Sequence, residues 1–420
     1  MTTKSAMFRP PVLGGVIRVM MEAARRGFQP TDETWANLGQ GQPEIGELPG
    51  APPRPANIPI APGDFAYGPV AGLSELRTAV AAHYNRLFRA DRPSQYTADN
   101  VIISAGGRSV LTRAIAALQQ TRLGFLSPDY IAFGDLTSAF RDVSPMLIGR
   151  TRSTNFSLTA DGLGDAVRRH ALGGVIFSNP CNPTGRCLIG DELAAWCETA
   201  RSLGCTLLVD EFYSHYIWRP VGSRGDGGPV SAAEFVDDVD RDPVLIVDGI
   251  TKNFRCPGLR LGWAIGPTDV IRAMTASGNY TDGGAPVVIQ RAALEMLAPE
   301  RADRESAAIR RMFREKRALV LDRLHDMGIA PVREPEGAFY AFASLAALPP
   351  PLNDGWEFAR QALDARVIVV PGESFDLASS IDSRLQPDLN DFVRISFGPP
   401  VGIVRAGLDR LAALIGDHRR

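Results

Sequence analysis

The stretch Val244-Leu-Ile-Val-Asp-Gly-Ile-Thr-Lys252 runs from four branched aliphatic residues to a lysine. Such an apolar run is typical of a strand that is buried on both faces of a parallel sheet. Similar runs begin at Val101, Leu123, Gly174, Thr206 and Leu261, and amphipathic segments expected to be helices lie at 108–120, 160–170 and 190–203. This alternation of strands and helices predicts an α/β domain whose sheet is mainly parallel.

Lys252 stands out because the chain has only two other lysines, Lys4 and Lys316, among its 45 basic residues. Lys4 falls in an expected terminal arm. Lys316 lies in a charged helical run, Arg310 to Arg317, where we expect it to be solvated. Lys252 follows a strand, and ligands of open α/β sheets bind at the carboxyl ends of strands. A partly desolvated amine at such a place has a depressed pKa and can attack a carbonyl group.

The length of the chain predicts more than one domain. The sequence has 420 residues, 45% of them hydrophobic, whereas single cores rarely grow beyond about 250–300 residues. Residues 43–63 hold seven prolines and are expected to form an irregular loop on the surface. Helices are expected at 12–26, at 72–88 with Ser74 as a cap, and at 301–326. We therefore expect an N-terminal arm and part of a small domain at 1–64, a large domain at 65–300 and a small α+β domain at 301–420.

Charge and cysteine content narrow the class of protein. The formal net charge of −2 gives no reason to expect a nucleic-acid or membrane-surface partner. The five cysteines form no Cys-x-x-Cys or zinc-like spacing, so we expect reduced thiols and no metal site. Residues 1–10 carry no signal-peptide core, and no apolar run reaches the roughly 20 residues of a membrane helix. These observations predict a cytoplasmic protein with a small-molecule substrate.

Unusual residues gather where the predicted strands end. Ser104-Ala-Gly-Gly-Arg-Ser109 closes a strand and opens a helix, so it could cradle an anion or simply reverse the chain. Asp210 could cap a helix or supply a buried anion for a protonated ring nitrogen. Asn179-Pro-Cys-Asn-Pro-Thr-Gly185 is a dense turn whose asparagines could also aim amides into a cleft.

Two arginines complete the set of candidate residues. Arg260, eight residues beyond Lys252, could offer a fork of donors to a phosphate. Arg394 lies in the alternating segment Phe392-Val-Arg-Ile-Ser-Phe397, where it could either face solvent or bind an anion. A phosphate cradle, an anion for a ring nitrogen, a nucleophilic amine and a carboxylate-binding arginine are the parts that pyridoxal-phosphate (PLP) chemistry needs.

The sequence also resembles a known family, the class I and II aminotransferases, which are fold-type I PLP enzymes. The resemblance rests on the turn 179–185, Asp210-Glu-Phe-Tyr213, Thr251-Lys252 and Arg260, and the order and spacing hold from about Asn37 to Arg394. It implies a large domain with a mainly parallel seven-stranded sheet and a smaller α+β domain. It also implies PLP as the cofactor and an amino acid as the substrate.

The resemblance implies three catalytic residues. Lys252 would hold PLP as a Schiff base and move the proton between the substrate and the cofactor. Asp210 would pair with the protonated pyridine nitrogen. Tyr213, together with Asn182, would bond the phenolic oxygen of the ring.

The remaining roles concern the phosphate, the substrate and a second subunit. Tyr130 would stack on the ring, and Arg394 would bind the substrate carboxylate with help from Asn182 and the Gly41 backbone. Tyr67, in Tyr-Gly-Pro-Val-Ala-Gly-Leu, matches a tyrosine that crosses to the phosphate of a neighbouring subunit, which implies a homodimer with shared active sites. The phosphate would be held by the backbone amides of Gly106, Gly107 and Arg108, and by Thr251 and Arg260.

Departures from the family pattern leave the reaction open. The proline-rich stretch 43–63 replaces a regular helix near the substrate mouth, and Cys181 stands where asparagine is common. Transamination is the leading hypothesis, but a carbon–sulfur lyase or an oxidative deaminase would use the same residues. A ligand-sensing domain and a chance coincidence of motifs are two further hypotheses. The substrate side chain would be read by loops 41–66, 129–135 and 277–286, and the loop 219–240 is either an insertion or a flap.

Overall fold

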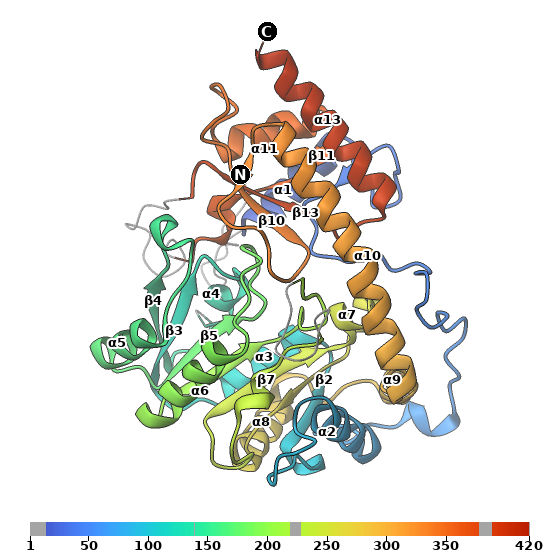
Figure 1. Cartoon of the computed structure of the whole chain (residues 1–420). Helices are drawn as coiled ribbons and strands as arrows, with labels where there is room; N and C mark the ends of the chain where they lie inside the picture. Colours follow the sequence, from blue (N-terminus) through green and yellow to red (C-terminus); the bar gives the residue numbers. More distant parts are fainter. Residues whose placement is uncertain (1–13, 138, 219–227, 378–388, 420) are drawn as a thin grey trace, which may run out of the picture.

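The computed structural model describes residues 14–137, 139–218, 228–377 and 389–419. The molecule consists of two parts, which Figure 1 shows one above the other. The lower part is built on a seven-stranded sheet with the strand order β2-β8-β7-β6-β5-β3-β4. Only β8 runs antiparallel to its neighbours, so the expected mainly parallel sheet is confirmed. The strands are β2 (Val101–Ser104), β3 (Thr121–Ser127), β4 (Val143–Gly149), β5 (Gly174–Ser178), β6 (Thr206–Asp210), β7 (Val244–Gly249) and β8 (Gly262–Ile265).

The edge strand β4 is absent from the apolar runs recognised in the sequence. Its segment, Val143-Ser-Pro-Met-Leu-Ile-Gly149, carries Ser144 and Pro145 near its start, and these residues hide the strand pattern. Proline is tolerated here because β4 has a neighbour on one side only, β3. Local composition alone therefore predicts six of the seven strands.

Successive residues of a strand point to opposite faces of the sheet, and here both sets are apolar. Helices therefore cover both faces. Leu245 and Val247 of β7 join the core under α3 and α8, whereas Val244 and Ile246 join the core under α2, α5 and α6. The covering helices are α2 (Ser74–Phe88), α3 (Gly107–Ala116), α5 (Ala160–His170), α6 (Asp191–Leu203), α8 (Thr268–Thr281) and α9 (Val287–Met296). Ser74 does not cap α2, contrary to the prediction, because Leu73 occupies the capping position and Ser74 is already helical.

The upper part contains a four-stranded antiparallel sheet in the order β12-β13-β10-β9 and a parallel pair, β1 and β11. The N-terminal strand β1 pairs here, and α1 packs on β12 and β11, so the beginning of the chain lies with its end. The proposed boundaries at 64 and 300 stay predictions. The elements are α1 (Gly15–Arg25), β1 (Ala36–Asn37), α10 (Pro299–Asp326), β9 (Ala330–Pro331), β10 (Tyr340–Ser344), α11 (Gly355–Asp364), β11 (Val367–Ile368), β12 (Val370–Pro371), β13 (Phe392–Ser396) and α13 (Val401–Arg419).

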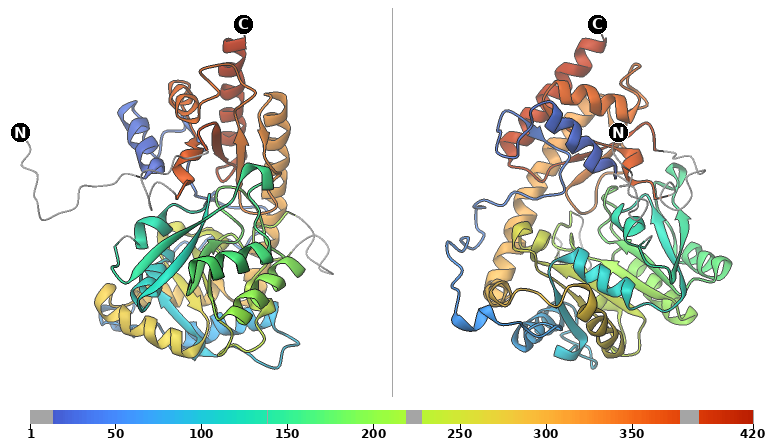
Figure 2. Two further views of the ribbon diagram at one scale, coloured as in Figure 1. Left: turned by 90° about the vertical axis from the view of Figure 1, so that its left-hand side faces the viewer. Right: turned by 180° about the vertical axis from the view of Figure 1, so that it is seen from behind.

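The proline-rich segment 43–63 and the long helix α10 connect the two parts. The segment runs down the outside of the molecule, as the view from behind shows (Figure 2). Lys316 of α10 is completely buried beside it and donates hydrogen bonds to Glu44 Oε1 (2.7 Å) and to the Pro399 carbonyl (2.6 Å). The expectation of a solvated Lys316 is therefore wrong. Because its neighbours in the sequence are charged, the pattern did not reveal that Lys316 lies on the face of α10 that packs against the upper part.

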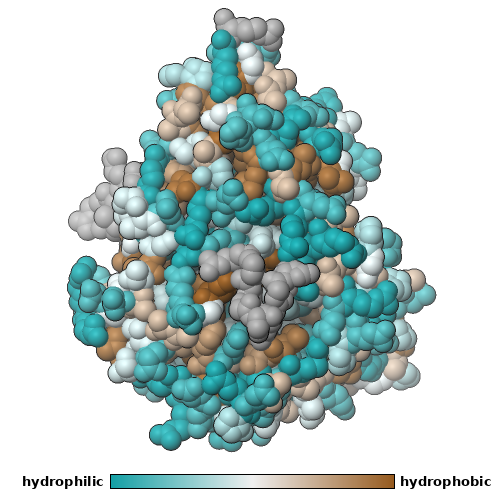
Figure 3. All heavy atoms as spheres, viewed as in Figure 1, coloured by the Kyte–Doolittle hydropathy of each residue, from teal (hydrophilic) through white to brown (hydrophobic). Residues whose placement is uncertain are grey.

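The face seen in Figure 3 is predominantly hydrophilic, with apolar residues in separate patches. Within the described residues, no helix combines the length and apolar character that crossing a bilayer requires.

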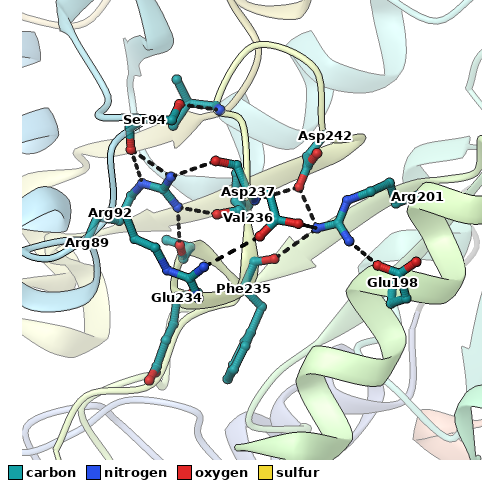
Figure 4. A network of polar contacts seen from close by, with 12 residues as sticks. Arg89, Arg92, Ser94, Glu198, Arg201, Glu234, Phe235, Val236, Asp237 and Asp242 are labelled. Carbon is teal, nitrogen blue, oxygen red and sulfur yellow. Dashed lines mark hydrogen bonds and ion pairs between the residues drawn. The ribbon is translucent and has the colours of Figure 1, made fainter.

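Residues 231–242 are held firmly against the lower part (Figure 4). Arg89, fully buried at the end of α2, donates to the carbonyls of Ala233 (2.7 Å), Val236 (2.6 Å) and Ser94 (2.9 Å). Arg201 of α6 binds Asp242 (2.7 Å) from the other side. The C-terminal half of the 219–240 loop is therefore not a flap, and residues 219–227 lie outside the described residues.

Replacement of Arg89 tests this anchoring. Arg89→Ala should lower the free energy of unfolding by about 3 kcal/mol, because buried carbonyl groups lose their donors. Arg92→Ala is the matched control, since Arg92 binds the same loop but is partly exposed; its effect should stay below about 1 kcal/mol. Urea denaturation followed by circular dichroism measures both, and equal effects would contradict the assigned role of Arg89.

Candidate active site

Lys252 lies on the short helix α7 (Ile250–Asn253), directly after β7, where the lower sheet faces the upper part (Figure 1). Its Nζ donates a hydrogen bond to the Gly41 carbonyl, which comes from the N-terminal segment. Burial lowers the pKa of Lys252 to about 8, and the positive charges of Arg260, Arg394 and Arg108 act in the same direction. A substantial fraction of this amine is therefore neutral, and thus nucleophilic, near physiological pH.

Asp210 ends β6, the strand next to β7, and its carboxyl group is buried. Burial raises the pKa of Asp210 to about 7, the buried Asp129 adds to the rise, and the Phe212 amide and Lys252 oppose it. The Phe212 N–H donates to Asp210 Oδ1 at 3.2 Å, which leaves the other carboxylate oxygen free of any hydrogen bond among the described residues. A cation placed beside this carboxyl group would be strongly held, because a buried charge needs a partner.

The N-terminus of α3 forms an anion cradle. Gly106 has a φ of 91° and a Cβ there would lie 2.5 Å from an Arg260 guanidinium nitrogen, so only glycine fits. The first amides of α3, from Gly107 onward, have no partners within the helix. Thr251 Oγ1 is buried and has no hydrogen-bond partner in the described parts of the chain. These groups, together with Arg260, fit a phosphate.

Arg394 projects from β13 into the same region. Its guanidinium donates to Asn182 Oδ1 (2.8 Å) and to the Gly39 carbonyl (2.5 Å), and only 3% of the residue is exposed. Among the described residues no carboxylate lies within salt-bridge distance of it, and its Nε is buried without a partner. A buried, unpaired arginine is costly unless an external anion completes it, so Arg394 fits the carboxylate of a small molecule.

Tyr213, three residues beyond Asp210, is buried and shares a hydrogen bond of 2.7 Å with the hydroxyl of Tyr340. Burial raises the pKa of Tyr213 well above the ordinary value, so its hydroxyl stays protonated and can donate. Tyr340 belongs to β10 and was missed in the sequence. Its signal was the apolar run near 338–343, since Tyr340–Ser344 pairs with the strand that carries Arg394.

Tyr130 and Arg108 face each other at the rim of the site. Arg108 Nε donates to Tyr130 Oη at 3.1 Å. The loop of Tyr130 is fixed by Asp129, which accepts hydrogen bonds from the Tyr130 amide (2.7 Å) and from the Ser178 hydroxyl. Ser178 in turn accepts from the Asn182 amide (3.0 Å). Asp129, buried with its pKa raised to about 6, was not recognised in the sequence as part of the site.

A third residue that was not recognised in the sequence supports the anion cradle. Asp282, at the end of α8, accepts hydrogen bonds from Ser104 (2.9 Å) and Ser109, and it pairs with the buried Arg113 (3.0 Å to Nε). The loop 282–284 is thereby tied to the start of α3. No local motif marks Asp282, because Ser104, Ser109 and Arg113 lie more than 160 residues away along the chain.

Of the residues predicted from the sequence, Tyr67 alone stays apart from this group, with a side chain that is fully exposed. The structure brings together Gly41, Gly106, Gly107, Arg108, Tyr130, Asn182, Asp210, Tyr213, Thr251, Lys252, Arg260 and Arg394. A partly neutral amine, a buried carboxylate, an anion cradle with an orphaned hydroxyl and an unpaired arginine all fit PLP and an amino acid. The individual roles remain predictions.

Comparison with known proteins agrees with this chemistry. The family model for aminotransferase class I and II matches residues 33–411. The chain belongs to the class I and II aminotransferases. Members of this family depend on PLP, so the protein is a PLP-dependent enzyme.

Individual relatives cover nearly all of this aminotransferase-family chain. A valine–pyruvate aminotransferase of Mycobacterium tuberculosis is 30% identical over 410 residues, or 95% of each chain. An aspartate/prephenate aminotransferase of Thermus thermophilus is 27% identical and covers 90% of each. Among solved structures, an aminotransferase from Mycobacterium tuberculosis has 26% identity and a TM-score of 0.76, with 99% of this chain and 100% of that chain covered. A tryptophan complex of a Thermus thermophilus aspartate aminotransferase mutant has the same coverage, 24% identity and a TM-score of 0.79, which supports the fold.

The depressed pKa of Lys252 can be measured directly. After reductive ¹³C-methylation of the PLP-free protein, the methyl signal of Lys252 should titrate near pH 8, whereas an ordinary lysine titrates near 10.4. Lys252→Met assigns the signal, since the chain has only three lysines. A Lys252 signal that titrates near 10.4 would contradict the desolvated environment described above.

Proposed function

We propose that this enzyme transfers the amino group of an amino acid to a 2-oxo acid. The observation that carries the proposal is the buried Arg394, unpaired by any described carboxylate and close enough to Lys252 to lower its pKa. A carboxylate bound at Arg394 would hold its α-carbon next to the Lys252 amine. The relatives described above, all named as aminotransferases, support the same reaction.

Each residue of the site has a role in this proposal. Bound PLP supplies an electron-withdrawing ring that stabilises negative charge at the substrate α-carbon. Lys252 holds PLP through its amine and, once displaced by the substrate, takes the proton from the α-carbon. Asp210 keeps the ring nitrogen protonated by its buried negative charge. Tyr213 and Asn182 hold the phenolic oxygen, and Tyr130 covers the ring face.

Binding of the phosphate and the substrate carboxylate sets the geometry. The amides of Gly106, Gly107 and Arg108, the Thr251 hydroxyl and the Arg260 guanidinium hold the phosphate. Arg394, oriented by Asn182 and by the Gly39 carbonyl, holds the carboxylate at the other end of the site. Fixing both ends orients the bond at the α-carbon that has to break.

We further propose that the active enzyme is a homodimer. Tyr67 is fully exposed, and Phe65 (86%) and Ile60 (66%) nearby are exposed as well, which is unusual for large apolar side chains. A second copy that covered this segment would bury these residues and bring Tyr67 to the phosphate of the other subunit. Location in the cytoplasm stays a prediction from the sequence.

The proposed reaction predicts that turnover needs two substrates. With valine or aspartate as the donor, the PLP-loaded enzyme should form a new amino acid only when a 2-oxo acid such as pyruvate is present. Release of ammonia from these donors without any acceptor would favour the oxidative deaminase instead. Release of pyruvate from a donor with a sulfur leaving group on its β-carbon would favour the lyase. Lys252→Ala should reduce turnover to background, and Lys4→Ala is the matched control that should leave it unchanged.

Shared active sites predict complementation between two variants. A Tyr67→Ala chain keeps Lys252, and a Lys252→Ala chain keeps Tyr67, so a mixed dimer contains one site with both residues. After the two variants are unfolded together and refolded, activity should exceed the sum of the two separately refolded variants. If mixing adds nothing although sedimentation shows mixed dimers, Tyr67 does not serve the site of its partner.

A further inference from the structure

Tyr340 lies between the residue proposed to bind the substrate carboxylate and the residue proposed to bind the cofactor oxygen. β10 and β13 run antiparallel, with Tyr340 opposite Ser396 and Phe342 opposite Arg394. Tyr340 and Arg394 are therefore diagonal neighbours on one face of the sheet. The Arg394 guanidinium lies 4.4 Å from the centre of the Tyr340 ring, within the range of a cation–π interaction.

The hydroxyl of Tyr340 points to Tyr213 and is completely buried. The two hydroxyl oxygens are 2.7 Å apart. A Cβ on Gly41 would lie 2.7 Å from the Tyr340 hydroxyl, so the absence of a side chain at Gly41 is what leaves room for this contact. The Gly41 carbonyl also accepts the hydrogen bond from Lys252. Tyr340 thus sits where the carboxylate, cofactor and lysine parts of the site meet.

The direction of the hydrogen bond follows from the proposed role of Tyr213. If Tyr213 donates its proton to the phenolic oxygen of the cofactor, its own oxygen must accept from Tyr340. Hydrogen bonds in such a chain polarise one another, so donation by Tyr340 strengthens donation by Tyr213. The positive charge of Arg394 beside the Tyr340 ring makes Tyr340 a better donor, and a carboxylate bound at Arg394 weakens this effect.

We propose that Tyr340 is a positioning residue that couples the charge state of Arg394 to the protonation of the PLP Schiff base through Tyr213. The inference rests on the proposed function, in which Arg394 binds the substrate and Tyr213 the cofactor. With Arg394 unpaired, the chain stabilises the deprotonated Schiff base. Substrate binding neutralises Arg394, which relaxes the chain and favours the protonated form, the form that a substrate amine attacks.

Other charged groups around the pair contribute a background that the variants below leave unchanged. Burial raises the pKa of Tyr340 to about 12 even with Arg394 beside it, so Tyr340 itself stays protonated in the working range of pH. Apart from Arg394, the titratable and charged groups that act on Tyr213, Tyr340 or Lys252 from the surrounding elements are Asp210, Tyr130, Arg108 and Arg260.

The test is a pH titration of the visible absorbance of the PLP-loaded protein. Tyr340→Phe keeps the ring beside Arg394 and removes only the hydroxyl. We expect the midpoint of the titration to rise by about half a pH unit, the size of one modest hydrogen bond. Tyr96→Phe is the matched control. Tyr96 is also buried, but its hydroxyl lies in the other core and has no hydrogen-bond partner among the residues that the structure describes. Its midpoint should equal that of the wild type.

A double-mutant cycle separates the coupling from a general disturbance of the site. Arg394→Met should shift the midpoint more in the wild type than in the Tyr340→Phe background, because part of the effect passes through the hydroxyl. A wild-type midpoint in Tyr340→Phe, or strictly additive shifts in the cycle, would overturn the role of Tyr340 while leaving the proposed function intact. A wild-type protein that forms no visible band with PLP would overturn the proposed function itself.

Discussion

The burial of Lys252 among charged groups is the constraint on which the rest of the site depends. Burial in the interior disfavours the ammonium form, and nearby arginines add to that effect, so the pKa of the amine falls to about 8. The same burial raises the pKa of Asp210 to about 7 on the neighbouring strand. Both pKa values thus lie near neutral pH, so a substantial fraction of each group is uncharged before the cofactor binds. Buried charged groups that lack partners are energetically unfavourable. Ligands that supply those partners remove this cost and are therefore bound more tightly.

The architecture supplies this environment where interior strands of the lower and upper sheets bring their residues to one site. β6 and β7 of the lower sheet deliver Asp210 and Lys252 at their carboxyl ends, as open α/β sheets do. β13 and β10 of the upper sheet deliver Arg394 and Tyr340 from the opposite side. The N-terminal segment closes the gap through the Gly39 and Gly41 carbonyls. Lys316 and its bond to Glu44 fasten that segment to α10, which gives a buried structural task to a lysine whose sequence neighbours predict a solvated position.

Local sequence patterns predict the parts of this arrangement that depend on neighbours along the chain. Periodicity and turn chemistry are local properties of the sequence. They therefore reveal the strand-like runs that end in Asp210 or Lys252 and the glycines before α3. Tyr340, Asp129 and Asp282 do not, since their importance comes from partners on distant segments. The edge strand β4 was hidden by Pro145, and Lys316 by the charges around it. The family resemblance predicts the seventh strand and a role for Tyr67 in a second subunit, whereas the single chain shows Tyr67 only as an exposed aromatic side chain.

Covalent attachment of PLP to Lys252 can be tested directly, because the chain has only three lysines. The PLP-loaded protein would be reduced with borohydride, digested and mapped by mass spectrometry. The account predicts a phosphopyridoxyl group on the peptide that contains Lys252 and on no other lysine peptide. A stable adduct on Lys4 or Lys316 with Lys252 unmodified, or no adduct after loading with PLP, would contradict it.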